Sequence, residues 1–406
     1  MKFNPRLETL PDFPFDRLRS LLQGTEPPVG IEPISLAVGE PQQPAPDWVS
    51  AIVADHHHLW NKYPPFAGSP DLRQAIAGYL TRRYGLAAGD VCAQANVLPC
   101  AGTREALYLL PTWSVPDTKA GGRPIVAMPN PFYHVYGTAA LASGAESLYL
   151  SATEKTGHLP DLSALEESTL RRMAVMFLCS PANPQGVMAD GGYLENAIRL
   201  ARQYDFLLIV DECYAEIYDR APPVGTLQVC RDMASGQNSH MFDNVIVFHS
   251  LSKRSNGAGI RSGFLAGDPA IIEAHGRLRS YISATIPGPI DAASVALWND
   301  DSHVKGVRNF YRQNIEAAEQ VLTGRFGFYR PPGGFFLWLD VGLGIEGGEA
   351  AAKTLWQKAA VRVLPGAYTS RVDEAGKNPG TPYIRVALVN DATTIQVACE
   401  RIVKVL

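Results

Sequence analysis

The sequence has few charged residues and no block of one sign. Lysine and arginine number 36 against 40 aspartate and glutamate residues, so the formal net charge is −4, and charged residues make up 19% of the chain. A nucleic-acid-binding protein needs a basic stripe that displaces counterions from phosphates, so we expect no nucleic-acid partner. Disorder is not expected either, because 46% of the residues are apolar and can form a buried core.

Patterns typical of metal-binding, secreted and membrane-spanning proteins are also missing. The six cysteines form no Cys-x-x-Cys pair, and the triplet His56, His57 and His58 has no fitting carboxylates or thiols nearby, so we expect no metal site. The N-terminal residues contain no apolar signal region, and the strongest apolar run, at residues 206–210, is far too short to cross a bilayer. These features predict a cytoplasmic protein with no membrane partner.

The middle of the chain alternates between short apolar runs and helical patterns. The apolar runs lie at residues 124–128, 174–179, 207–210 and 245–248, and a clear helical pattern lies at residues 71–84. Runs of this length, apolar on both faces and separated by helices, predict an α/β fold with a mostly parallel sheet covered by helices.

The character of the sequence changes after about residue 297. A long helical pattern at residues 304–322 leads into an expected strand at residues 333–339, and the chain ends in a helical pattern at residues 393–406. We therefore expect a large domain and a smaller α/β domain, to which an N-terminal segment contributes. The predicted boundaries are residues 1–45 for the segment, 46–296 for the large domain and 297–406 for the small domain.

Four polar side chains lie at or just after the expected strands. Asp211 ends one apolar run and Tyr214 follows it, while Asn183 and Lys253 each follow another run. In a parallel sheet such ends meet at one edge, where ligands bind. A carboxylate, a phenol, an amide and an amine meet the needs of pyridoxal 5′-phosphate, whose ring nitrogen takes an anion and whose aldehyde takes an amine. Each residue alone also has an ordinary interpretation, such as a solvated lysine or a turn asparagine.

These motifs, in this order and spacing, resemble the class I and II aminotransferases of fold type I. The resemblance extends over nearly the whole chain, from Val-Gly-Glu-Pro at residues 38–41 to Tyr-Ile-Arg-Val at residues 383–386. It implies a large domain with a mostly parallel central sheet flanked by helices, and a smaller α/β domain. It also implies a pyridoxal-phosphate-dependent enzyme that exchanges amino groups between amino acids and keto acids.

The resemblance implies roles for the four polar residues. Lys253 is expected to bind the cofactor as a Schiff base and then to act as general base, and Asp211 to pair with the ring nitrogen. Tyr214 and Asn183 are expected to hydrogen-bond the ring oxygen, and Asn183 also counts among the substrate-binding residues.

The resemblance also implies which residues bind the phosphate of the cofactor and which aromatic residue stacks on its ring. A helix N-terminus with a nearby guanidinium is a sound anion site. The ring is expected to stack on Tyr133, with Phe132 and Tyr136 as neighbouring alternatives. The residues expected at the phosphate are Gly102, Thr103, Ser250 and Arg261.

The substrate and a partner subunit are expected at further residues. Arg385 stands in an apolar strand, where an unpaired charge is costly, and the resemblance implies that its guanidinium binds the substrate α-carboxylate. Gly39 resembles the flexible glycine that closes over the substrate. Tyr63 resembles a tyrosine that reaches the phosphate of the neighbouring subunit, which predicts a homodimer with shared active sites. His134 and His249 flank expected site residues without an assigned role.

Three short segments resemble the proteobacterial N-succinyldiaminopimelate aminotransferases of lysine biosynthesis. They lie at residues 11–18, 63–68 and 249–256, and they imply amino exchange between glutamate and N-succinyl-2-amino-6-ketopimelate. The Asn-Gly-Ala-Gly stretch at residues 256–259 departs from the expected pattern and could change the stiffness of that loop. Two alternatives stay open: a broad aspartate or aromatic aminotransferase, and another fold type I enzyme such as a lyase, decarboxylase or synthase.

Overall fold

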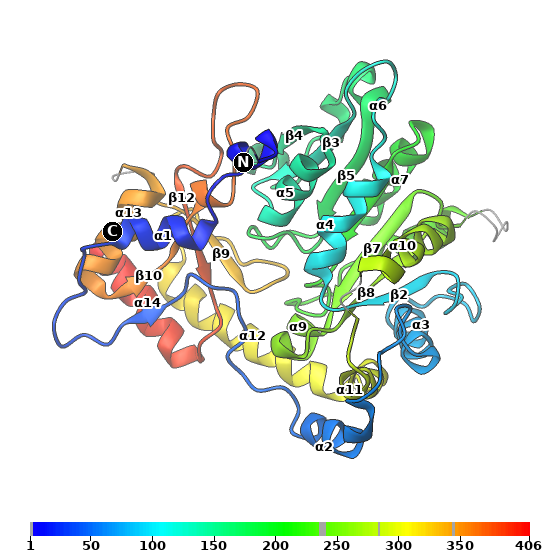
Figure 1. Cartoon of the computed structure of the whole chain (residues 1–406). Coiled ribbons are helices and arrows are strands. Elements are labelled where there is room, and N and C mark those ends of the chain that lie inside the picture. The colour runs from blue at the N-terminus through cyan, green and yellow to red at the C-terminus, as the bar shows by residue number, and fades with distance from the viewer. Residues whose placement is uncertain (1–2, 235–240, 283–284, 343–345) are drawn as a thin grey trace.

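The structure is a computed structural model, and it describes residues 3–234, 241–282, 285–342 and 346–406. It contains a seven-stranded sheet, a three-stranded sheet and a pair of short strands (Figure 1). Within the described ranges, no helix combines the length and the apolar character needed to cross a membrane.

The seven-stranded sheet is parallel except for strand β8 (Gly263–Gly267), which runs antiparallel to both of its neighbours. The order across the sheet is β2 (Val97–Cys100), β8, β7 (Val245–Ser250), β6 (Leu207–Asp211), β5 (Met173–Cys179), β3 (Ile125–Asn130) and β4 (Glu146–Ser151). Strands β3, β5, β6 and β7 match the four predicted apolar runs, and their carboxyl ends meet at one edge of the sheet. The predicted mostly parallel sheet is therefore confirmed.

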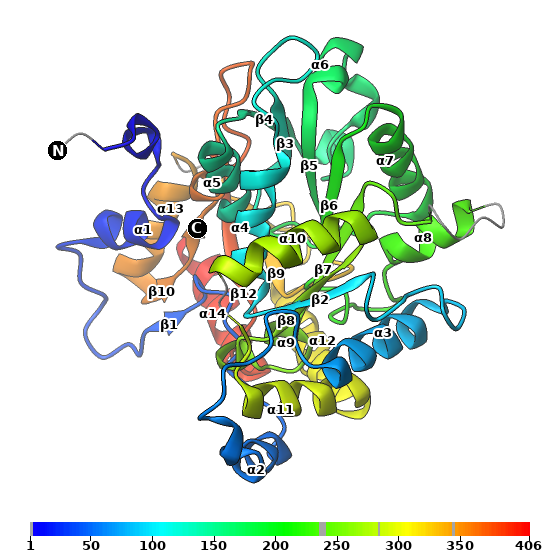
Figure 2. The ribbon, with the colours of Figure 1, turned by 45° about the vertical axis from the view of Figure 1, so that its right-hand side comes forward.

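Helices cover both faces of this sheet (Figure 2). Along β6, Leu208 and Val210 pack into the core on one face, and Leu207 and Ile209 pack into the core on the other. Since side chains alternate along a strand, burial on both faces requires the continuous apolar run that the sequence contains. The first face carries α3 (Pro70–Tyr84), α7 (Gly191–Gln203), α8 (Thr226–Met233) and α11 (Gly288–Asn299), and the second carries α4 (Thr103–Ser114), α5 (His134–Ser143) and α10 (Pro269–Ile282).

Local sequence sets both ends of α3. The Ser69 hydroxyl accepts a hydrogen bond from the Leu72 N–H at 3.0 Å, and Pro70 takes the first helical position. Gly85 then ends the helix with a φ of 60°, a left-handed conformation that glycine adopts without strain. The helix predicted at residues 71–84 is therefore confirmed.

A second hydrophobic core joins the two ends of the chain. Ile34 and Leu36 pack among C-terminal side chains, and strand β1 (Ile34–Ser35) pairs in parallel with β10 (Val361–Arg362). Helix α1 (Pro14–Leu22) contacts α13 (Gly347–Ala359) on the same side of the molecule (Figure 1). The predicted domain boundaries at residues 45 and 296 stay predictions.

The C-terminal part of the chain also contains α12 (Ser302–Leu322), β9 (Phe336–Asp340), β11 (Leu364–Pro365), β12 (Tyr383–Ala387) and α14 (Ala392–Val405). Three further helices lie earlier in the chain: α2 (Trp48–Asp55), α6 (Glu167–Arg172) and α9 (Leu251–Arg254).

Candidate active site

A cavity of about 370 Å³ lies at the carboxyl edge of the seven-stranded sheet. Its walls include the last residues of β5, β6 and β7 and the first residues of α4 and α5. Residues of the N-terminal segment and of β9 and β12 complete it, so distant parts of the chain meet there. The predicted site residues that line this cavity are Gly39, Thr103, Tyr133, Asn183, Asp211, Tyr214, Ser250, Lys253, Arg261 and Arg385.

Asp211 ends β6 as a buried carboxylate, only 5% exposed. The Tyr136 hydroxyl donates a hydrogen bond to Asp211 Oδ2 at 2.8 Å, and the Cys213 N–H donates to Oδ1 at 3.1 Å. Among the described residues no cationic side chain forms an ion pair with this carboxylate. Since a buried charge is costly without a charged partner, Asp211 suits a ligand that brings a cation, such as a protonated ring nitrogen.

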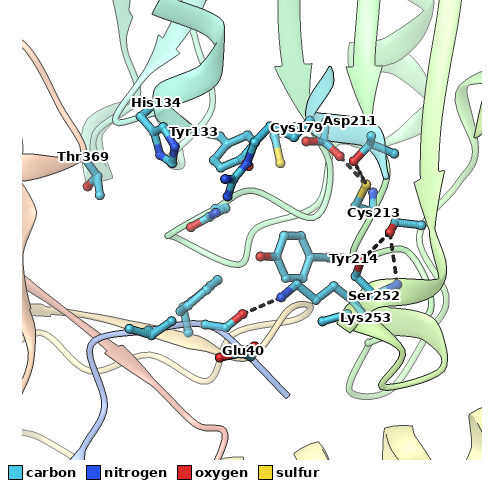
Figure 3. A pocket seen from close by; sticks show the side chains of 18 of the residues that line it. Glu40, Tyr133, His134, Cys179, Asp211, Cys213, Tyr214, Ser252, Lys253 and Thr369 are labelled. Carbon is cyan, nitrogen blue, oxygen red and sulfur yellow. Dashed lines mark hydrogen bonds between the residues drawn. The ribbon is translucent and has the colours of Figure 1, made fainter. Parts of the chain in front are cut away.

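Lys253 lies on α9, directly after β7, and its amine points into the cavity (Figure 3). Its Nζ donates a hydrogen bond to the carbonyl of Gly39, and it lies 5.3 Å from the centre of the Phe335 ring. Burial disfavours the ammonium form and lowers the pKa of Lys253 to about 8. An amine with this pKa is partly neutral near neutral pH, which makes it a better nucleophile and base than a solvated lysine.

Arg385 brings a buried guanidinium to the cavity from β12. One terminal nitrogen donates to the Ala37 carbonyl at 2.8 Å, the other approaches Asn183 Oδ1 at 3.4 Å, and the group lies over the Phe336 ring at 4.4 Å. Burial lowers the pKa of Arg385 to about 10, and its Nε is buried without a hydrogen-bond partner. A buried guanidinium with an unused donor is suited to a carboxylate ligand.

The start of α4 and Arg261 form a cationic corner of the cavity. Thr103 is the first residue of α4, and Gly102 precedes it with a φ of 83°. A Cβ atom on Gly102 would overlap the Arg261 guanidinium, so only glycine allows this close approach. Ser250, buried at the end of β7, lines the same cavity. Such a corner can hold a phosphate.

These features fit pyridoxal phosphate. The cationic corner suits its phosphate, the buried Asp211 carboxylate suits its ring nitrogen, and the Lys253 amine suits its aldehyde. The individual assignments stay predictions.

Of the three aromatic residues weighed for the ring, Tyr133 lines the cavity. Phe132 packs against Tyr149 with a ring-centre distance of 5.4 Å, and Tyr136 is fully buried against Asp211. Tyr214 lines the cavity as well, and burial raises the pKa of its phenol well above the usual value. Tyr214 is therefore a neutral hydrogen-bond donor at physiological pH.

The two histidines without an assigned role lie in different places. His134 lines the cavity, where burial and nearby arginines lower its pKa to about 4, so its ring is neutral (Figure 3). His249 is buried outside the cavity lining, with Nε2 3.0 Å from Glu212 Oε2.

Two predicted site residues do not line the cavity. Gly102 lies just behind Thr103 and acts through its close approach to Arg261. Tyr63 is fully exposed and lies outside the cavity of its own chain. In the stretch at residues 256–259, Ala258 lines the cavity and its carbonyl accepts a hydrogen bond from Arg261 at 3.0 Å.

Sequence reasoning missed several cavity or supporting residues. Arg104 directly follows the Gly-Thr pair, and Glu40 directly follows Gly39, so both could have been found as neighbours of expected site residues. The sequence suggests Tyr136 only as a neighbour of the ring, whereas its hydroxyl donates a hydrogen bond to Asp211. Phe336 carried no signal, because its contact with Arg385 joins two separate strands.

The chain matches known proteins over nearly its whole length. The model of the family described as Aminotransferase class I and II matches residues 31–402. The LL-diaminopimelate aminotransferase of Desulforudis audaxviator is 30% identical over 98% of this chain and 96% of its own length. The 4-dedimethylamino-4-oxo-anhydrotetracycline transaminase of Streptomyces rimosus is 32% identical over 98% of this chain and 100% of its own. Among solved structures, an aminotransferase from Neisseria meningitidis is 37% identical, covers 99% of both chains and has a TM-score of 0.91.

Proposed function

The chain belongs to the class I and II aminotransferase family, and we propose that it transfers the amino group of glutamate to N-succinyl-2-amino-6-ketopimelate, in diaminopimelate and lysine biosynthesis. Family membership makes it a pyridoxal-phosphate-dependent aminotransferase that acts on amino and keto acids. The observation that carries amino transfer is one cavity in which a lysine with a lowered pKa and a buried, partly unpaired arginine lie together. A cytoplasmic location agrees with such a role and stays a prediction.

The choice of substrate has two sources of support. Several curated relatives are named LL-diaminopimelate aminotransferase, and the proposed acceptor has the carbon skeleton of diaminopimelate, with one amino group succinylated and a keto group in place of the other. The short segments noted in the sequence favour the succinylated form. The names of the relatives favour LL-diaminopimelate itself, which is the second candidate.

The side chains of the cavity divide the chemical work. Pyridoxal phosphate supplies an aldehyde that condenses with amines and a ring that takes up negative charge. Arg385 binds the substrate α-carboxylate and so orients the Cα–H bond. Because the pKa of Lys253 is near 8, a fraction of its amine is neutral near neutral pH. This neutral Nζ accepts the Cα proton and returns it to the product. With the cofactor bound, Asp211 would keep a proton on the ring nitrogen, and Tyr214 and Asn183 would donate to the ring oxygen.

We propose further that the active enzyme is a homodimer. The support is the resemblance at residues 63–68 together with the full exposure of Tyr63, which leaves its side chain free to reach a partner subunit. In the dimer its hydroxyl would reach the phosphate bound by the partner subunit.

A donor and acceptor screen tests the proposed substrates. The purified holoenzyme is assayed in the reverse direction with 2-oxoglutarate and, in turn, N-succinyl-LL-diaminopimelate, LL-diaminopimelate, aspartate and phenylalanine. The highest kcat/KM is expected for the succinylated compound. A higher value for LL-diaminopimelate supports the second candidate, a higher value for aspartate or phenylalanine supports a broad aminotransferase, and product without amino exchange indicates another fold type I reaction.

Arg385→Lys tests the α-carboxylate site. Lysine keeps the charge but loses the two parallel donors, so kcat/KM should fall on the order of 10²-fold for glutamate and for the second substrate alike. Arg171→Lys is the matched control, because Arg171 pairs with Glu167 on the exposed side of α6. A loss with only one of the two substrates would show that Arg385 reads a side chain instead.

A further inference from the structure

Two buried titratable side chains take no part in the proposed reaction, although each is the direct neighbour of a cavity residue. Glu212 follows Asp211, the last residue of β6, and His249 precedes Ser250, the last residue of β7. Both are at most 3% exposed, and His249 Nε2 lies 3.0 Å from Glu212 Oε2. We propose that Glu212 and His249 are a pair of positioning residues that hold the Asp211 and Ser250 side chains at the spacing pyridoxal phosphate requires. This inference rests on the proposed function and adds positioning residues to it.

The alternation of side chains along the two strands places this pair on the opposite side of the sheet from the cavity. Asp211 and Ser250 line the cavity. Since neighbouring side chains along a strand point to opposite faces, Glu212 and His249 turn to the face that carries α3 and α8. The hydrogen bond from the hydroxyl of Thr226, the first residue of α8, to Glu212 agrees with this placement. Contact between Glu212 and His249 therefore joins the ends of β6 and β7 from behind the cavity.

The Glu212 carboxylate is surrounded by donors. Its Oε1 accepts hydrogen bonds from the N–H and the hydroxyl of Thr226 at 2.7 and 2.6 Å, and its Oε2 accepts one from the Tyr84 hydroxyl at 2.9 Å. Burial alone would raise the pKa of Glu212, but the hydrogen bonds from His249 and Thr226 hold it below its usual value, so the group is ionised. The carboxylate is fixed in position, because turning it would leave buried donors unpaired.

Aromatic rings enclose His249 and fix the other half of the pair. The His249 ring stacks on Phe264 with a centre-to-centre distance of 5.2 Å, and the Tyr79 ring meets it edge-on at 5.7 Å. Phe264 belongs to β8, which lies beside β7 on the side away from β6. The ring of His249 is therefore packed between β8 and Glu212, and it cannot move far from either.

The spacing of the two strand ends matters because the proposed ligand is rigid. Asp211 is expected at the ring nitrogen of pyridoxal phosphate and Ser250 at its phosphate, and the flat ring fixes the distance between these groups. A displacement of about 1 Å at either strand end would misplace a hydrogen bond to the ligand. Glu212 and His249 thus act on the ligand through their neighbours and do not line the cavity themselves.

Hydrogen exchange of the cofactor-free protein tests the positioning role without any ligand. Glu212→Gln keeps the size of the side chain but removes its charge and one acceptor, and His249→Phe keeps a ring but removes the donor. In both variants, amides at residues 211–214 and 248–253 should exchange about tenfold faster or more, because the strand ends open more often. The N–H of Glu212, which donates to the Phe248 carbonyl at 2.9 Å, lies in the first of these segments.

Leu355→Ala is the matched control for stability. Leu355 is fully buried in the second hydrophobic core on α13, so its truncation destabilises the protein at a place that does not line the cavity. The exchange of residues 211–214 and 248–253 should stay unchanged in this variant.

Fluorescence titration then links the strand ends to the ligand. The dissociation constant of pyridoxal phosphate should rise about tenfold or more in Glu212→Gln and in His249→Phe, and stay within about twofold in Leu355→Ala. The double variant should bind no more weakly than the weaker single variant, since the two residues act as a unit. In the loaded variants, the NMR shift of the ring nitrogen should move towards that of an unprotonated ring, which a loss of stability alone would not cause.

Two results would overturn the proposal. If Glu212→Gln and His249→Phe change exchange and cofactor binding no more than Leu355→Ala does, the pair contributes stability only. If the strand ends open in hydrogen exchange while the cofactor binds as tightly as before, the pair does not position Asp211 and Ser250 for this ligand. Neither measurement uses a substrate, so a failure of the proposed substrates would leave both results unchanged and is distinguishable from a failure of this inference.

Discussion

Lys253 has a pH dependence that follows from its burial. The cavity disfavours the ammonium form, so the pKa falls from the ordinary 10.5 to about 8, and the neutral amine prevails only above that pH. Attachment of pyridoxal phosphate to the cofactor-free enzyme should therefore accelerate as pH rises through about 8. Borohydride trapping followed by peptide mapping measures the rate and the position. A label on another lysine, or an apparent pKa near that of free lysine, would contradict the assignment.

The lowered pKa of Lys253 also makes the free energy of unfolding depend on pH. Between pH 8 and 10.5 the unfolded chain binds the Lys253 proton more tightly than the folded chain, so the free energy of unfolding rises with pH in this window. Lys253→Met cannot titrate and is the reference. Urea unfolding of the two cofactor-free proteins measures this effect. The free energy of unfolding of the unsubstituted protein should rise relative to that of Lys253→Met as pH increases from 8 to 10.5.

Asp211 is expected to matter for the reaction more than for attachment of the cofactor. Asp211→Asn keeps the shape of the side chain but removes the charge that holds a proton on the ring nitrogen. Transamination should fall on the order of 10²-fold or more while the cofactor stays bound through its phosphate. Tyr136→Phe, which removes one hydrogen bond to Asp211, should cost much less. Near-normal turnover of well-folded Asp211→Asn would refute this role.

At the scale of elements, the approach of Arg261 to the start of α4 depends on one glycine. In Gly102→Ala the new methyl group meets the guanidinium of Arg261, and the φ of 83° becomes strained. Arg261 must turn away, so the dissociation constant of pyridoxal phosphate should rise about tenfold or more, which fluorescence titration can measure.

A substitution at Gly89 is the control that separates the effect of backbone strain from the effect of the contact with Arg261. Gly89 has a φ of 93°, and a methyl group added there would meet no other heavy atom within 4 Å. Gly89→Ala should therefore cost about 1–3 kcal/mol of stability from backbone strain alone and leave cofactor binding unchanged. If both variants affect the cofactor equally, the contact with Arg261 is not what matters.

At the scale of the whole molecule, a shared active site makes a prediction for mixed subunits. Tyr63→Ala and Lys253→Ala should each be impaired as pure proteins. In a heterodimer of the two, one site combines an intact Lys253 with the intact Tyr63 of the partner subunit, so about half of the sites should recover. Differently tagged subunits allow the heterodimer to be purified and assayed. No recovery in a confirmed heterodimer would mean that each chain is self-sufficient.

Much of this protein is determined by short stretches of sequence. The apolar runs of β5, β6 and β7 predict buried parallel strands because side chains on both faces must be apolar there. The Ser69 cap and Gly85 mark the ends of α3 because each satisfies backbone groups of its own helix. Residues at the ends of such strands or directly after them are expected to gather at one edge of the sheet, so the sequence alone identifies Asp211 and Lys253 as candidates.

Other features exist only in the tertiary structure. The pairing of β1 with β10, the pairing of β8 with β2 and the hydrogen bond from Tyr136 to Asp211 join segments that are distant in the chain. Such contacts leave no local periodicity, because they depend on which faces the packed elements turn towards each other. The same holds for the hydrogen bond from Arg104 Nε to the Tyr133 hydroxyl, because it joins the first turn of α4 to the residue that precedes α5.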